Sequence, residues 1–161
     1  MMRILINSIN YHPELTGIGK YTGEMAEWAA RHGHEVRVVT APPYYPAWRL
    51  GDGYSGHGYR REDMAGVRVF RCPLWVPRVP TGRKRILHLG LFALGCAPVM
   101  LWQGLVWRPD VVFVVEPPFF CAPVAWLTAK LARGRAWLHV QDFEIDAAFE
   151  FAKTAPFPDP A

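Results

Sequence analysis

The sequence predicts an α/β fold, with a Rossmann-like, doubly wound parallel sheet. Short apolar runs rich in β-branched residues alternate with segments of helical periodicity along the 161-residue chain. The run at residues 110–115 is continuously apolar after its first residue, as expected for a strand in the middle of a parallel sheet. A glycine-containing loop joins the first run to the first helical segment, and ligands bind at such loops in open α/β sheets.

The first strand is expected at residues 3–9 and the first helix at residues 18–31, which ends just before Gly33. Four large apolar residues recur at helical spacing and predict its buried face. They are Ile18, Tyr21, Met25 and Trp28.

The next strands are expected at residues 34–40, 67–72, 110–115 and 136–141. Prolines exclude regular structure from residues 41–48, and residues 49–65 are interpreted as one long exposed loop. Helices are expected at 86–107, 119–133 and from 142 onward, with the first kinked or broken by Pro98. Right-handed crossovers then give the strand order 3-2-1-4-5, in which strands 1 and 4 flank the switch point.

Composition excludes several classes of protein. The chain is 51% hydrophobic and 20% charged, so it is not disordered. Its net charge of +4 is dispersed and argues against nucleic-acid binding. The three cysteines form no Cys-x-x-Cys pair, so neither a zinc site nor a disulfide framework is indicated, and a reducing cytoplasmic location is expected.

The first loop is the best candidate for an anion site. Gly17, Ile18 and Gly19 lie where the first strand turns into the first helix, whose free N–H groups favour a phosphate. The spacing is not the dinucleotide fingerprint G-x-G-x-x-G, because position 22 is Thr. A tight turn without a ligand is the alternative.

Residues 10–28, 31–46 and 138–146 resemble the N-terminal domain of family 4 (GT-B) glycosyltransferases. Within that family they are most similar to the colanic-acid and O-antigen-type enzymes of bacterial exopolysaccharide synthesis. The resemblance implies two Rossmann-like domains facing a cleft. The N-terminal domain binds the acceptor and lays its glycine loop, here Gly17 to Gly19, against the donor diphosphate. The C-terminal domain binds most of the nucleotide sugar.

The resemblance further implies a retaining transfer from a nucleotide sugar to a glycan acceptor, without a metal ion or other cofactor. It covers residues 2–153 as a partial N-terminal domain, and residues 154–161 form a proline-rich tail outside the family pattern. The donor domain is absent from this sequence, so the fragment alone is expected to be inactive. The alternative function is a non-catalytic membrane-docking or binding module of the same fold.

Asp142, at the end of the last expected strand, matches an acidic residue of the family and is the candidate for the catalytic region; it is equally a candidate helix N-cap. Glu14 is expected to contact an acceptor hydroxyl or to be a solvated loop carboxylate. Tyr44 and Tyr45 are expected to stack on a sugar or lipid, or to pack on the domain itself. Glu116 either faces the glycine edge as an acceptor-side group or complements a helix N-terminus. His12, in the first loop, either binds a phosphate, shuttles a proton, or has neither role.

Residues 86–107 carry no formal charge and are long enough to span a membrane. Spanning would place strands of one sheet on opposite sides of the bilayer. The favoured interpretation is a crossover helix that rests on the inner face of the cytoplasmic membrane, where a lipid-linked acceptor would be found. Ordinary packing in the core is the other alternative. The residues expected to anchor it are Arg83, Lys84, Arg85, Trp102 and Trp107.

Overall fold

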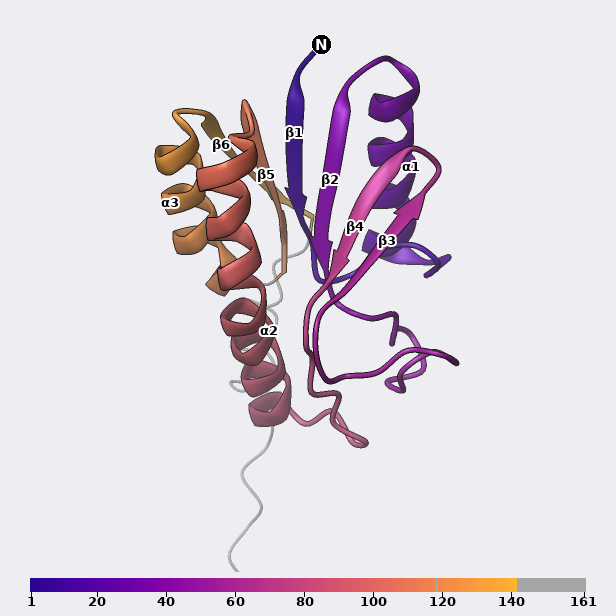
Figure 1. Ribbon diagram of the computed structural model, residues 1–161. Helices are drawn as coiled ribbons and strands as arrows, with labels where there is room; N and C mark the ends of the chain where they lie inside the picture. The colour runs from indigo at the N-terminus through magenta and orange to yellow at the C-terminus, as the bar shows by residue number, and fades with distance from the viewer. Residues whose placement is uncertain (118, 142–161) are drawn as a thin grey trace, which may run out of the picture.

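The computed structural model describes residues 1–117 and 119–141, and these form three layers. A six-stranded sheet has one helix on one face and two on the other (Figure 1). The helices are α1 (Gly17–Arg31), α2 (Gly82–Trp102) and α3 (Ala122–Ala132), with a π-helical turn η1 (Gln103–Trp107) and a 3-10 turn η2 (Phe119–Cys121). The strands are β1 (Arg3–Asn7), β2 (Glu35–Thr40), β3 (Arg60–Met64), β4 (Val67–Arg71), β5 (Val111–Glu116) and β6 (Arg135–Val140).

The sheet confirms the predicted fold class. Its order is β3-β4-β2-β1-β5-β6, and the five predicted strands run parallel in the predicted order, with β1 between β2 and β5. The carboxyl ends of these strands lie at the lower edge of the sheet in Figure 1, together with the loops that follow β1, β2 and β4. A ligand site is expected at that edge.

One strand was missed by the sequence analysis. β3 lies inside the segment expected to be a long loop, and it pairs antiparallel with β4 at the sheet edge. Its sequence, Arg-Arg-Glu-Asp-Met, lacks the apolar alternation that marks a half-buried strand. The feature that defines the hairpin is its two-residue turn. Ala65 and Gly66 both adopt positive φ there, as a type I′ turn requires.

The buried face of α1 differs from the predicted one. Tyr21 and Trp28 are more than half exposed and Met25 is about one-third exposed, at 59%, 54% and 36%. The helix instead turns its small residues inward; these are Gly19, Thr22, Gly23, Ala26 and Ala29. Small side chains let the helix axis approach the sheet closely, and the apolar periodicity of the large residues therefore pointed to the wrong face.

Helix α2 is continuous through Pro98, so the expected break does not occur, and the irregular part is the π-helical turn that follows. Its first turns extend beyond the carboxyl edge of the sheet and lie beside the loops there (Figure 1). The helical stretch Gly82–Trp107 satisfies the length and composition of a membrane span, with 33% of its most apolar window buried.

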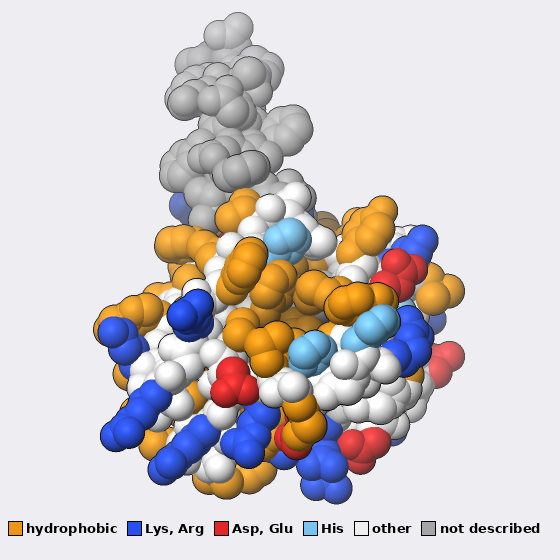
Figure 2. Space-filling model, turned by 90° about the horizontal axis from the view of Figure 1, so that it is seen from above, with side chains coloured by type: hydrophobic (Ala, Val, Ile, Leu, Met, Phe, Trp, Pro, Cys, Tyr) orange, Lys and Arg blue, Asp and Glu red, His pale blue; other side chains and the backbone are white. Residues whose placement is uncertain are grey.

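The opposite edge of the sheet, where the parallel strands begin, presents a different surface. Figure 2 shows Lys and Arg side chains along its rim and apolar side chains around a hollow in its middle. β6 ends the strand order of the described sheet on the side of β5, and its Trp137, Leu138 and Val140 are exposed.

Candidate functional site

A pocket of about 250 Å³ lies at the carboxyl edge, as the switch-point rule predicts. Four segments supply its walls: the first loop and the start of α1, the loop after β2, the first turns of α2, and the residue after β5. The lining residues include Asn10, Gly17, Ile18, Tyr44, Tyr45, Trp48, Arg85, His88 and Pro117. The structure thus brings the glycine loop and both predicted tyrosines to one cavity.

The two glycines of the first loop are required for different reasons. Gly17 has a φ of +54°, which L side chains rarely adopt, and a Cβ there would meet no atom within 4 Å. Its backbone therefore borders open space in the pocket. Gly19 has no such strain, but a Cβ would lie 2.9 Å from the Cβ of Glu14. Gly19 makes room for a buried carboxylate, and Gly17 leaves room for a ligand.

Glu14 is not a solvated loop carboxylate, because only 5% of the residue is exposed. Its Oε1 accepts hydrogen bonds from the backbone N–H groups of Tyr44 and Tyr45, at 2.8 and 2.9 Å. Its Oε2 accepts one from Asn10 Nδ2 at 2.8 Å. Burial raises the pKa of Glu14, while these hydrogen bonds and the charge of Arg71 lower it. The carboxylate joins the first loop to the loop after β2, and its contact with an acceptor hydroxyl stays a prediction.

The aromatic residues after β2 divide into a buried and an exposed set. Tyr44 is 6% exposed, and its ring packs edge-on against His88, with centroids 4.8 Å apart. Trp48 is half-buried between His88 and Arg85, whose guanidinium lies 5.6 Å from the Trp48 ring centre. Tyr45 is 44% exposed. Tyr44 therefore packs on the domain itself, and Tyr45 and Trp48 remain available to stack on a ligand.

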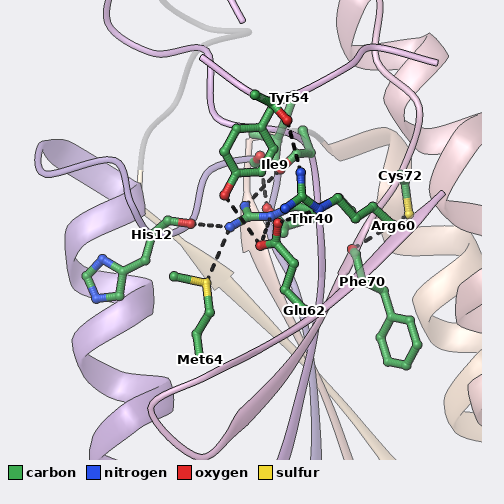
Figure 3. Close-up of polar contacts among 12 residues, drawn as sticks. Ile9, His12, Thr40, Tyr54, Arg60, Glu62, Met64, Phe70 and Cys72 are labelled. Atoms are coloured by element: carbon green, nitrogen blue, oxygen red, sulfur yellow. Dashed lines mark hydrogen bonds and ion pairs between the residues drawn. The ribbon is translucent and has the colours of Figure 1, made fainter. Parts of the chain in front are cut away.

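A buried arginine network that the sequence analysis missed holds these loops (Figure 3). Arg71 donates to the backbone oxygens of Ala41, at 3.0 Å, and of His12, and its Nε lies 3.1 Å from Glu62 Oε2. Figure 3 shows His12 from the first loop and Glu62 and Met64 from β3, which all contact the Arg71 guanidinium. The alternation of residues along a strand could have indicated this burial, because Val67, Val69 and Arg71 lie two positions apart and share the buried face of β4.

His12 itself faces α1 and not the pocket. Its Nε2 lies 3.3 Å from Glu27 Oε1, and its ring occupies the space that a Cβ on Gly23 would need. Among the alternatives for this residue, the structure favours the one without a phosphate role.

Similarity to known proteins agrees with this architecture. Residues 16–157 match the glycosyl transferase 4-like domain. This chain belongs to that family. It is also similar to WcaI of Escherichia coli (strain K12), a protein named as a colanic acid biosynthesis glycosyl transferase, with 56% identity over 146 residues. The match covers 91% of this chain and 35% of the relative, so the chain spans about a third of that protein's length.

Two further residues were predicted for the site of this glycosyl transferase 4-like domain, Glu116 and Asp142, and the structure describes the first of them. Glu116, at the end of β5, is 6% exposed and lies at the same edge as the glycines. Asp142 lies outside the described residues. No group of three or more His, Cys, Asp or Glu residues that could hold a metal ion occurs within residues 1–117 and 119–141.

The expected membrane anchors of the family domain are only partly accessible. Arg83, Lys84 and Arg85 are exposed at the start of α2, and Trp102 is 50% exposed. Trp107 is wrongly predicted, because it is buried; its Nε1 donates to Glu35 Oε2 at 3.1 Å, and the Arg37 guanidinium lies 4.3 Å from its ring centre.

Proposed function

We propose that this chain is the N-terminal, acceptor-side part of a retaining glycosyltransferase of bacterial exopolysaccharide synthesis. The enzyme transfers a sugar from a nucleotide sugar to a lipid-linked glycan. One observation carries the proposal: a chain of the glycosyl transferase 4-like family has a cavity at the switch-point edge, bordered by its glycine loop and by aromatic side chains. The named role of the 56% identical relative supports colanic acid as the product.

In this proposal the two sides of the pocket have different tasks. Gly17 and the first N–H groups of α1 face the donor diphosphate, because a helix N-terminus favours an anion and Gly17 leaves space for it. Tyr45 and Trp48 face the acceptor, because aromatic rings that border a pocket can stack on sugars. Asp142 serves the catalytic region, and no metal ion takes part.

The fragment alone is proposed to be inactive. Transfer needs groups held on both sides of the reacting centre, and the pocket supplies only those of the proposed acceptor-side domain. The share of the relative that this chain matches, 35%, is consistent with a further domain supplying the other wall.

A chimera tests the function. The matching 146 residues of the E. coli relative are replaced by those of this chain, and colanic acid is measured in a strain that lacks the relative. We expect the chimera to restore production, the 161-residue chain alone to fail, and Gly17→Val in the chimera to abolish production while lowering the melting temperature too little to account for the loss, although Val at this positive φ is strained. A folded chimera that restores nothing would favour the non-catalytic binding module.

We also propose that the outer face of α2 rests on the inner surface of the cytoplasmic membrane. Ile86, Leu87, Leu91 and Leu94 are exposed along this helix, and no charged residue follows Arg85 until Arg108. The basic cluster at the helix start would attract anionic lipid at about 1 kcal/mol per residue. Spanning is disfavoured, because α2 connects β4 and β5 of one sheet.

Vesicle co-sedimentation tests this docking. We expect the chain to sediment with anionic vesicles and much less with neutral ones, and a variant with Arg83, Lys84 and Arg85 changed to Ser to stay in the supernatant. Equal recovery in the supernatant with and without anionic vesicles would contradict docking. Resistance to carbonate extraction would favour spanning instead.

A further inference from the structure

His88 is a buried polar residue in the pocket wall that none of the functional roles above uses. It lies in the second turn of α2, is fully buried, and packs against the rings of Tyr44 and Trp48, with centroids 4.8 and 5.4 Å away. The same three residues line the 250 Å³ pocket. The ring nitrogens of a fully buried histidine in a pocket wall both need hydrogen-bond partners.

The tautomer of His88 follows from one contact. Nδ1 lies 2.7 Å from the backbone oxygen of Trp75. A carbonyl oxygen only accepts hydrogen bonds, so Nδ1 carries the proton and Nε2 presents a lone pair. Burial lowers the pKa of His88, the charge of Arg85 lowers it further, and the bond to Trp75 opposes them. The ring is therefore neutral at neutral pH.

Nε2 is a buried acceptor that makes no hydrogen bond with the described residues. Leaving such an atom without a partner costs about 1–3 kcal/mol. A phosphate or carboxylate oxygen offers no hydrogen to this lone pair, whereas a hydroxyl group does.

We propose that Nε2 of His88 accepts a hydrogen bond from a hydroxyl group of a sugar ring bound in this pocket. The inference rests on the proposed function and names one contact of its acceptor site. Tyr45, Trp48 and His88 line the same pocket, and because Nε2 is shielded from solvent, a neighbouring side chain moves when the sugar hydroxyl reaches it. The cavity is smaller than the range of about 300–1,000 Å³ typical of drug-sized ligands, which suits a single sugar ring.

Nitrogen NMR tests the tautomer first. Long-range proton–nitrogen spectra of the ¹⁵N-histidine-labelled chain should show His88 with a protonated Nδ1 and a bare Nε2 at pH 7. Titration with the methyl glycosides of glucose, galactose and mannose should move the Nε2 resonance of His88, while exposed His57 stays unchanged. A protonated Nε2, or the absence of any shift with all three glycosides, would overturn the proposal.

A cycle of ligand and protein changes then isolates the hydrogen bond. His88→Asn keeps a donor near the Trp75 carbonyl and removes Nε2, and His57→Asn is the matched control. Deoxyfluoro analogues of the glycoside that binds replace each hydroxyl in turn with a group that cannot donate. One analogue should bind the wild-type chain about three- to tenfold more weakly, and His88→Asn should bind that analogue and the parent glycoside equally.

The outcomes separate this inference from the function on which it rests. If every deoxyfluoro analogue binds the wild type as well as its parent does, Nε2 has no such partner and the inference fails, whether or not His88→Asn folds. In the chimera, His88→Asn should raise the KM for the acceptor with little change in kcat. An active chimera whose acceptor KM is insensitive to His88→Asn would overturn the inference alone, whereas a folded but inactive chimera would overturn the proposed function.

Discussion

The two helical layers of this domain are built differently. On one face, α1 packs small residues against the sheet and carries charged residues outside, with ion pairs Lys20–Glu24 and Glu27–Arg31. On the other face, α2 packs large apolar residues such as Phe92 and Met100 inward, whereas α3 packs small ones, and both helices also expose apolar residues, such as Leu94 at 73% and Trp126 at 58%. Polar contacts fix the first loop on the α1 side, through Glu14 and Arg71.

The difference motivates the docking proposed above, in which the α2 layer meets an apolar surface and the α1 layer meets water. An exterior that alternates charges with isolated apolar residues needs no partner. A helix with no charge on its outer face over many turns is characteristic of a contact surface. Matched substitutions in the two layers should therefore differ in their effects on stability and on membrane binding.

Loss of the Glu14 carboxylate should have the largest effect on stability. Glu14→Ala leaves the backbone N–H groups of Tyr44 and Tyr45 without their acceptor, which we expect to lower the free energy of unfolding by about 2–4 kcal/mol. Glu14→Gln keeps an oxygen for both donors and removes a buried charge, so it should change stability by less than about 1 kcal/mol. Urea denaturation measures both; equal losses in the two variants would show that the charge and not the hydrogen bonds holds the loops.

A methyl group should have opposite effects on the two crossover helices. Gly23→Ala in α1 displaces the His12 ring and should cost about 1–3 kcal/mol. Gly90→Ala in α2 meets no atom within 4 Å, and should stabilise the chain by about 0.5–1 kcal/mol through helix propensity. Melting temperatures of the two variants compare them directly, and a harmless Gly23→Ala would refute close packing of α1.

How much the sequence could predict also differs between the layers. The parallel strands and their order follow from apolar runs and from the topology of α/β sheets, so they could be derived without the structure. The buried face of α1 could not, because Gly23 and Ala26 give a weaker apolar signal than Tyr21 and Trp28, although they are the residues that pack.

The site was predictable in its location and less so in its contacts. The glycine loop and the strand order place a pocket at the carboxyl edge. His88 and Arg71 were missed because the role of each depends on a backbone carbonyl that is distant in the sequence: Trp75 for the histidine, and Ala41 for the arginine. Trp107 was misjudged because its hydrogen bond to Glu35 joins the end of η1 to the start of β2, which lie 72 positions apart in the sequence.

The apolar exteriors should differ in membrane affinity. Leu94→Ser on α2 should weaken binding to anionic vesicles by about tenfold, since it removes roughly 1.5 kcal/mol of apolar burial at the bilayer surface. Met25→Ser on α1 should leave binding unchanged, because Lys20, Glu24 and Arg31 surround that side of the helix with charge. Sedimentation at several lipid concentrations gives both affinities; equal losses would show that the whole chain adheres non-specifically.

The smallest expected effect is a difference in pH dependence between Glu14 and His88, because burial shifts the pKa values of these two groups in opposite directions. The pKa of Glu14 is raised, so the unfolded chain ionises this group first as pH rises above its ordinary value of 4.5, and stability falls until the folded state also ionises. The pKa of His88 is lowered, so the unfolded chain binds a proton first as pH falls below 6.5, and stability is lost toward acid. Each group contributes a slope of at most about 1.4 kcal/mol per pH unit to the free energy of unfolding, and the two slopes have opposite signs.

Urea unfolding between pH 4 and 7 measures both slopes. The free energy of unfolding of Glu14→Gln should increase relative to that of the wild type as pH rises above 4.5. The advantage of the wild type over His88→Asn should also grow with pH and level off near 6.5. If the free energy of unfolding of His88→Asn changes with pH as that of the wild type does, His88 titrates alike in the folded and unfolded states. The neutral ring inferred from its burial would then be wrong.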